Sequence, residues 1–437
     1  MTKSLPLMED IWGLLGPDSV ESSRRTRTLG LGASVRLFND LAVPGIGGVW
    51  YAKQLLLATL GVSVAEQARK LGAKVQNVEV ANAIEALACR LAFDSNKWNR
   101  DARLRGNSKL QGKGDDLRFS RVRQRNFYVT QPMRMAMVQA LPALGLVKTD
   151  STRFNAFRPS EAGMKFVEEG CKNYRPYNRS VMEHLSLWVQ DQDDRVRSDV
   201  CRDCLSPLVS LEKDALRLLR ERLLQGGHER PEDKERRRNA LAWVENIRVS
   251  KRDPLTWGTK PKEITDAHWQ DLLAGARFFN ARAAAIQVLD VLEAHMGNQA
   301  HGQSYAVRTA TPESLSSALD SLRAAAQAFL EMQHKDLEAN SFCRECASGD
   351  DSQILQHLVT RDGHVLRLVG DEVKPGRAFR GSAPAEVNGD EAESPEGGGL
   401  LLPEGISYRV RNLYLLNLDL HGQLDPWLNP SAVGDHP

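Results

Sequence analysis

The chain has 437 residues, enough for two or three domains, and its hydrophobic fraction of 41% and charged fraction of 26% are ordinary for a globular protein. It contains no run of 18 apolar residues, and its first residues lack the basic patch and apolar core of a signal peptide. We therefore expect a cytoplasmic protein without a membrane segment. The formal net charge is only +2, but the charge is unevenly distributed along the chain.

Residues 1 to about 95 are expected to form a helical N-terminal domain. Apolar residues recur at helical spacing over 50–60, 64–71 and 78–93. In the last of these ranges Val80, Ile84, Leu87 and Leu91 fall on one face.

A basic segment follows between residues 97 and 125, with ten basic residues against three acidic ones. Aromatic residues lie in or beside it: Trp98, Phe119, Phe127 and Tyr128. Because each Lys or Arg contact with a phosphate releases condensed counterions, such a segment is typical of nucleic-acid binding. A solvated, arginine-rich loop is the alternative. The candidate phosphate contacts are Arg118, Arg121, Arg123 and Arg125.

Residues 120–170 predict a helix, a pair of short strands and a closing helix. The first helix begins at Pro132 and ends near Leu144-Gly145-Leu146-Val147, the strand pair lies around 153–158, and Ser160-Glu161-Ala162-Gly163 starts the last helix. Over roughly fifty residues this order resembles the second half of the winged-helix superfamily. Pro142 departs from the pattern, because it lies inside the expected recognition helix and would kink it.

The basic segment and the winged-helix-like elements are expected to form one domain over residues 96–175, and the resemblance implies roles for individual residues in it. The resemblance implies that Gln131, Arg134 and Gln139 face a groove of duplex DNA, while Lys148 and Arg153 contact backbone phosphates. Winged helices also serve as protein–protein modules, so a structural winged helix inside a larger assembly is the alternative.

Residues 180–350 are expected to form an α-helical bundle. Apolar stripes predict long helices over 266–296, with Thr265 as N-cap and Gly297 as the stop, and over 312–339. Shorter helices are expected over 208–224 and 232–247. The stripes of the two long helices suit lengthwise antiparallel packing.

Four of the six cysteines form two Cys-x-x-Cys pairs, Cys201/Cys204 and Cys343/Cys346. Two such pairs can surround one ion with four thiolates, and a cytoplasmic location disfavours disulfides. We therefore expect a structural Zn²⁺ that staples one end of the bundle. A redox centre is the alternative use of a Cys-x-x-Cys pair.

Residues 351–437 are expected to hold a small β element and a tail. Residues 364–369 read as a strand and 380–399 as a disordered loop. Residues 406–420 read as a second strand, which either completes a sheet with 364–369 or docks on a partner chain.

Few residues in the sequence indicate catalysis. Glu372 and Lys374 have the Glu-x-Lys spacing of a restriction-type nuclease core, with Asp362 as the one candidate upstream acid. The sequence thus predicts a mainly α, non-catalytic protein that binds nucleic acid, with duplex DNA as the expected ligand, and that works with other protein subunits. A helical scaffold subunit of a complex is the first alternative, and a divalent-metal nuclease is the second.

Overall fold

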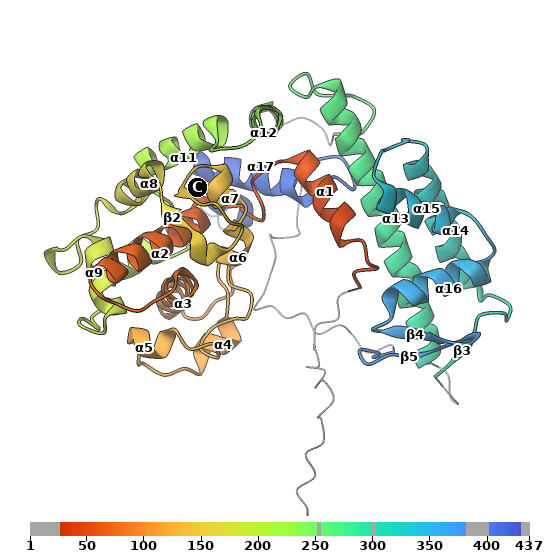
Figure 1. The fold of residues 1–437 in the computed structure, drawn as a ribbon, viewed down its shortest axis with the longest axis horizontal. Helices are drawn as coiled ribbons and strands as arrows, with labels where there is room; N and C mark the ends of the chain where they lie inside the picture. The colour runs from red at the N-terminus through yellow and green to blue at the C-terminus, as the bar shows by residue number, and fades with distance from the viewer. Residues whose placement is uncertain (1–26, 251–254, 299–302, 382–401, 430–437) are drawn as a thin grey trace, which may run out of the picture.

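The computed structural model describes residues 27–250, 255–298, 303–381 and 402–429. The fold is mainly helical, as predicted, and its elements form two lobes that stand as the two sides of an arch (Figure 1). Within the described ranges no helix is both long enough and apolar enough to cross a lipid bilayer.

The first lobe is on the left of Figure 1 and is built from many short and medium helices. Its elements are α2 (Ala52–Lys70), α3 (Asn77–Ser95), α4 (Asn107–Gln111), α5 (Phe119–Val122), α6 (Arg134–Met137), α7 (Ala140–Ala143), β1 (Val147–Lys148), the 3-10 turn η1 (Phe154–Ala156), β2 (Arg158–Pro159), α8 (Glu161–Cys171), η2 (Pro176–Asn178), α9 (Val181–Val189), α10 (Asp199–Leu205), α11 (Lys213–Gln225), α12 (Pro231–Ser250), α17 (Tyr408–Leu420) and α18 (Leu424–Leu428).

The second lobe is smaller and contains the longest helix. Its elements are α1 (Gly32–Ala42), α13 (Asp266–Gly297), β3 (Tyr305–Ala306), α14 (Glu313–Leu330), α15 (Leu337–Ala347), α16 (Asp351–Asp362), β4 (Leu366–Val369) and β5 (Glu372–Pro375). The strands form one antiparallel sheet in the order β3-β5-β4 (Figure 1).

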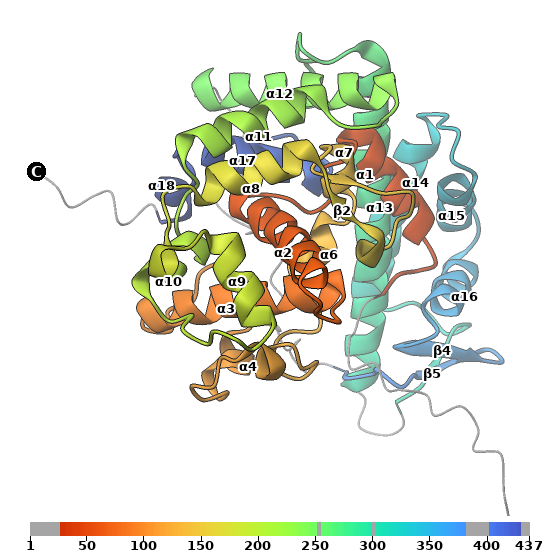
Figure 2. The same cartoon turned by 60° about the vertical axis from the view of Figure 1, so that its left-hand side comes forward.

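Each lobe has its own hydrophobic core. The first core surrounds α2 and α3, which are buried along most of their length because helices cover them on several sides. Figure 2 shows α8, α17, α11 and α12 layered beyond α2. The second core lies among α13, α14, α15 and α16.

The two cores meet along α1 and α13. Phe38 of α1 packs on Phe278 of α13 in the second core, with ring centroids 5.0 Å apart, whereas Ala42 at the end of α1 belongs to the first. On α13, Trp269 and Leu272 likewise belong to the first core. Segments 1–95, 96–175 and 180–350 of the sequence-based division therefore all contribute to the first core.

The predicted helix over 266–296 is confirmed as α13, and the Thr265 side chain accepts a hydrogen bond from the His268 N–H, as an N-cap does. The helix predicted over 312–339 is shorter than expected, because α14 ends at Leu330. Gln333 has a left-handed φ of 50°, and Asp336 caps a new helix by accepting from the Ala339 N–H.

The strand prediction for 406–420 is wrong, because the segment forms α17. Nine of the 13 residues of α17 are buried, polar ones among them, so the one-sided apolar pattern that identifies a surface helix is missing. The predicted strand over 364–369 is confirmed in β4, whose partner is β5 and not 406–420. Most of the expected loop over 380–399 lies outside the described residues.

Candidate nucleic-acid interface

A two-stranded hairpin joins α7 to α8. β1 pairs antiparallel with β2, in the register Val147 with Pro159 and Lys148 with Arg158. Ser160 then begins α8, because its hydroxyl accepts from the Gly163 N–H at 2.9 Å and donates to the Gly145 carbonyl at 2.6 Å. One side chain thereby fixes both the start of the helix and the end of the hairpin.

The expected recognition helix is divided into two short helices. α6 ends at Met137 and α7 begins at Ala140. Pro142 has no N–H to donate to the Val138 carbonyl four residues earlier, so the break between them falls where the sequence predicts a kink.

A buried carboxylate fixes the start of α6. Glu85 of α3 accepts from the Met133 N–H at 2.6 Å, from the Arg134 N–H at 3.1 Å and from the Tyr128 hydroxyl at 3.0 Å. Burial raises the pKa of Glu85, and the nearby Arg105 guanidinium opposes that shift. The donors of a helix N-terminus are thus satisfied by a side chain from another helix.

The three residues expected to face a DNA groove take different positions. Gln131 lines a groove described below. Arg134 is turned toward the protein, where it donates to Asn82 and its guanidinium lies 5.3 Å from the Phe154 ring centre. Gln139 donates to Asp40 at 2.6 Å and accepts from Arg409 at 2.9 Å.

The expected phosphate contacts are mostly exposed. Lys148, Arg153, Arg118, Arg123 and Arg125 are exposed, and Arg121 is half-buried. Some of these charges are partly neutralised. Arg123 pairs with Glu79, and Arg118 pairs with Asp116 at 2.8 Å and lowers the pKa of that carboxyl to about 2.

The aromatic residues of the basic segment do not form a stacking surface. Phe119, Phe127 and Tyr128 are buried in the first core. Trp98 stacks on Phe93, with ring centroids 5.2 Å apart and planes 2° from parallel. These rings hold the loops around α4 and α5 against the core.

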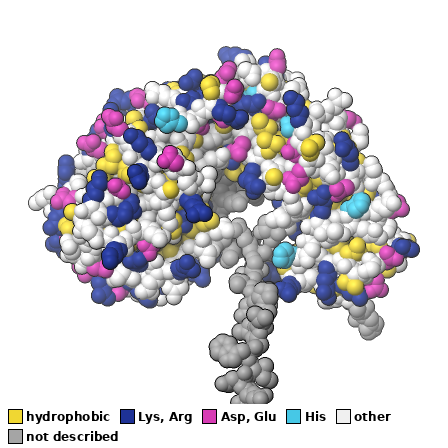
Figure 3. Space-filling model, viewed as in Figure 1, with side chains coloured by type: hydrophobic (Ala, Val, Ile, Leu, Met, Phe, Trp, Pro, Cys, Tyr) yellow, Lys and Arg dark blue, Asp and Glu magenta, His cyan; other side chains and the backbone are white. Residues whose placement is uncertain are grey.

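Five exposed cations from three segments lie on or near the turn between α2 and α3, and we call this the α2–α3 surface. Its members are Lys70, Lys74, Arg123, Arg153 and Arg158. The acid Glu66 pairs there with Lys70 and the acid Glu79 with Arg123. The hairpin is tied to this turn because Asn77 donates to the carbonyls of Phe154 and Phe157 at 3.0 and 2.8 Å. Figure 3 shows several Lys and Arg side chains at the lower edge of the first lobe.

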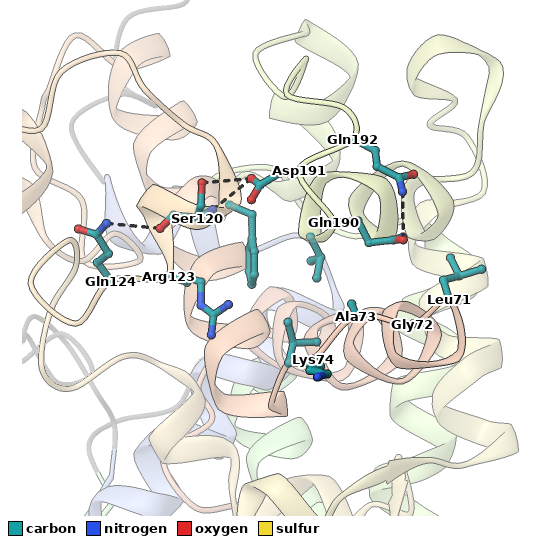
Figure 4. A pocket seen from close by; sticks show the side chains of 13 residues that line it. Leu71, Gly72, Ala73, Lys74, Ser120, Arg123, Gln124, Gln190, Asp191 and Gln192 are labelled. Atoms are coloured by element: carbon teal, nitrogen blue, oxygen red, sulfur yellow. Dashed lines mark hydrogen bonds between the residues drawn. The ribbon is translucent and has the colours of Figure 1, made fainter.

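A shallow depression of about 650 Å³ lies beside the α2–α3 surface. Figure 4 shows Lys74 and Arg123 in its wall, with Asp191 accepting from the Ser120 N–H and hydroxyl at 3.2 and 3.3 Å. The acid is therefore engaged with Ser120, while Lys74 lies in the turn after α2 and Arg123 pairs with Glu79 of α3.

A deeper groove of about 910 Å³, the α6–α17 groove, lies on the other side of the hairpin. It is lined by Gly47, Gly48, Trp50, Arg105, Gln131, Pro132, Met135, Ala136, Val138, Gln139, Pro142, Thr149, Asp150, Ser151, Thr152, Tyr408, Arg409 and Asn412. Its glycines are required for close approach, because a Cβ on Gly47 would lie 2.5 Å from the Ala136 carbonyl oxygen.

The α17 wall of the groove contains buried polar atoms without partners. Asn412 is 2% exposed and Arg409 is 5% exposed. Asn412 Oδ1 and Arg409 Nε make no hydrogen bond with the described residues. An unpaired buried polar atom costs about 1–3 kcal/mol, and the fold tolerates this cost at both atoms.

The two Cys-x-x-Cys pairs lie in different cores. Cys201 and Cys204 belong to the first core, and Cys343 and Cys346 to the second. Burial raises the pKa of the Cys343 thiol to about 12. Among the described residues no three or more Cys, His, Asp or Glu side chains gather in a metal-binding cluster. The two pairs therefore do not form one cluster among the described residues, and zinc binding stays a prediction.

A different pair of cysteines is in contact. Cys204 Sγ lies 3.6 Å from Cys171 Sγ and donates to it. This hydrogen bond lowers the pKa of Cys171 and raises that of Cys204, and the buried Lys53 ammonium, which donates to the Cys204 carbonyl at 2.9 Å, also favours the thiolate forms. The spacing of Cys171 in the sequence gives no indication of this contact.

The candidate nuclease residues do not form a metal site. Asp362 accepts from the Leu366 N–H at 3.0 Å and lies 3.7 Å from Arg27 Nε, at the base of β4. Glu372 pairs with Lys374 at 3.3 Å on β5. Both Asp362 and Glu372 therefore have structural partners.

Sequence reasoning missed most of the α6–α17 groove. Trp50 and Arg105 lie in segments interpreted as a helix and a basic loop, and Tyr408, Arg409 and Asn412 lie in the segment interpreted as a strand. The chain matches no protein family, and neither a curated protein sequence nor a solved structure is significantly similar to it.

Proposed function

We propose that this protein binds nucleic acid without catalysis, using the β1–β2 hairpin and the α2–α3 surface. The observation that carries this proposal is the convergence of Lys70, Lys74, Arg123, Arg153 and Arg158 around one hairpin. Cations brought together from separate segments produce a local positive potential that the overall charge of +2 conceals.

The order of elements supports the same proposal. α6 and α7, β1, β2 and α8 follow one another as the helix, wing and closing helix do in the winged-helix superfamily that the sequence resembles. In this proposal Lys148 and Arg153 lie on the wing and contact phosphates, while Arg118, Arg121 and Arg125 extend the contact along α5.

Arg134 and Gln139 have no direct role in base recognition in this proposal, because both are engaged within the protein. Binding is therefore mainly electrostatic, and its affinity falls steeply with salt.

Fluorescence anisotropy at two salt concentrations tests the proposal with the double variant Arg153→Glu/Arg158→Glu. Loss of the phosphate contacts should weaken binding at least tenfold at low salt, and should reduce the slope of log affinity against log salt by about one per lost contact. The matched control is Arg344→Glu/Arg367→Glu, which makes the same change in charge at two exposed positions of the second lobe.

If neither DNA nor RNA binds at low salt, the proposal fails and a scaffold subunit that uses the hairpin for protein contacts becomes the better account. Equal loss in the two double variants would also contradict it, because the effect would then follow total charge and not the α2–α3 surface.

A further inference from the structure

We propose that the α6–α17 groove holds one unpaired nucleotide, so that the protein prefers single-stranded to fully paired nucleic acid. This inference rests on the proposed function, because the α2–α3 surface supplies most of the affinity and the groove adds the preference for strand state. DNA and RNA share the recognised chemistry, which is a planar base linked to a phosphate.

The shape of the face between hairpin and α17 argues for an unpaired base. A helix that reads duplex DNA projects into the major groove. Here α6 and α7 are four residues each, and they form one wall of a concave groove whose other wall is α17. A concave site receives a base that has left the stack.

The groove offers ring and thioether surfaces for a base. Met135 and Tyr408 are 50% and 45% exposed in its lining, whereas Trp50 in the same lining is buried, with 2% exposure. Large exposed apolar side chains are few among the described residues, and two of them border this one groove. Base–aromatic stacking tolerates any sequence, because every base has a π-face.

The groove also offers hydrogen-bonding groups suited to a base edge. Asn412 lies in the lining and carries an amide, and an amide can pair with the donor–acceptor pattern of a base. Gln131 lies in the same lining and carries a second amide.

The charges of the groove suit the phosphate that accompanies the base. Arg105 is its half-buried cation and Asp150 is its exposed acid, while Arg409 in the same lining is buried and paired with Asp40. Arg105 is held in place by donating to the Gln131 carbonyl at 2.7 Å, and Arg409 by Asp40 and Gln139. The loop from Thr149 to Thr152 leads directly from the groove to Arg153, so one strand can run from the groove onto the α2–α3 surface.

The first test measures binding to single-stranded DNA, single-stranded RNA and duplex DNA of equal length. The wild-type protein should bind at least one single strand more tightly than the duplex. Tyr408→Ala should weaken single-strand binding about tenfold, the effect of losing one stacking contact, and should leave duplex binding unchanged. Tyr177→Ala is the matched control, because Tyr177 is 47% exposed and lies outside the groove.

Asn412→Leu keeps the test valid if Tyr408→Ala misfolds. Leucine is similar in size and removes an unpaired buried amide oxygen, so the melting temperature should stay the same or rise, while the preference for single strands is lost. A purely structural asparagine would instead give a lower melting temperature and an unchanged preference.

The two proposals fail in different ways. Salt-dependent duplex binding with no preference for single strands, or with a preference that Tyr408→Ala and Asn412→Leu both leave intact, overturns the groove assignment and leaves the α2–α3 surface standing. Absence of binding to all three ligands overturns both.

Discussion

Replacing Glu85 tests whether the geometry of the site depends on a buried carboxylate. In Glu85→Ala the N–H groups of Met133 and Arg134 and the hydroxyl of Tyr128 lose their acceptor. Each unsatisfied buried donor costs about 1–3 kcal/mol. The gain from no longer burying a carboxylate offsets part of this, so we expect a net loss of about 3 kcal/mol in the free energy of unfolding.

Urea denaturation followed by circular dichroism measures this loss. Glu85→Gln keeps one acceptor and should cost less than Glu85→Ala. Glu66→Ala is the control, because Glu66 pairs with Arg69 at the surface and should change stability by less than about 1 kcal/mol. A change below about 1 kcal/mol in Glu85→Ala would refute the reasoning.

The same side chain predicts a pH effect. Burial raises the pKa of Glu85 above its ordinary value of 4.5, so the folded protein takes up the proton at higher pH than the unfolded chain does. Stability therefore falls as pH rises from about 4.5 through the raised pKa. Glu85→Gln should flatten this part of the stability profile.

Three further predictions concern buried groups. Burial lowers the pKa of His268 to about 4, so the neutral side chain contributes about 3 kcal/mol to the free energy of unfolding. This contribution is complete above pH 6.5 and is lost as the pH falls to about 4. His268→Asn should reduce the dependence of stability on pH in this range, as measured by urea titrations. Mild oxidation should join Cys171 to Cys204, and a Cys201–Cys204 disulfide found by peptide mass spectrometry would contradict the observed contact. Zinc binding predicts one equivalent of zinc that is lost in Cys343→Ser, and a protein without zinc whose melting temperature is unchanged by EDTA would contradict it.

The sequence predicts the elements that follow a simple periodic or capping rule. Thr265 and the stripe after it indicate α13, and Ser160 indicates the start of α8; both caps form the expected hydrogen bonds. The α17 segment could not be identified in this way. It is buried between α12 and α2, so its apolar residues face several directions and no single period dominates.

The candidate site likewise contains residues that the sequence predicts and residues that it does not. Exposed arginines such as Arg153 and Arg123 can be found from the sequence, because a basic segment is apparent from its composition alone. The α6–α17 groove requires Trp50 to meet Asn412, more than 350 positions later, and no local pattern reports that contact. The two cysteine pairs show that similar local motifs need not lie together in the fold, because the motifs at Cys201 and Cys343 belong to separate cores.

Buried polar side chains determine how the segments around the groove are aligned. Glu85 holds the start of α6, Arg409 joins α17 to Asp40 and Gln139, and Asp419 accepts from the Ala52 N–H at 2.7 Å at the start of α2. Apolar contacts alone would leave these helices free to shift along one another, since the hydrophobic effect has no direction. Hydrogen bonds from fixed side chains allow one alignment, so these residues place Trp50, Met135 and Asn412 around a single groove.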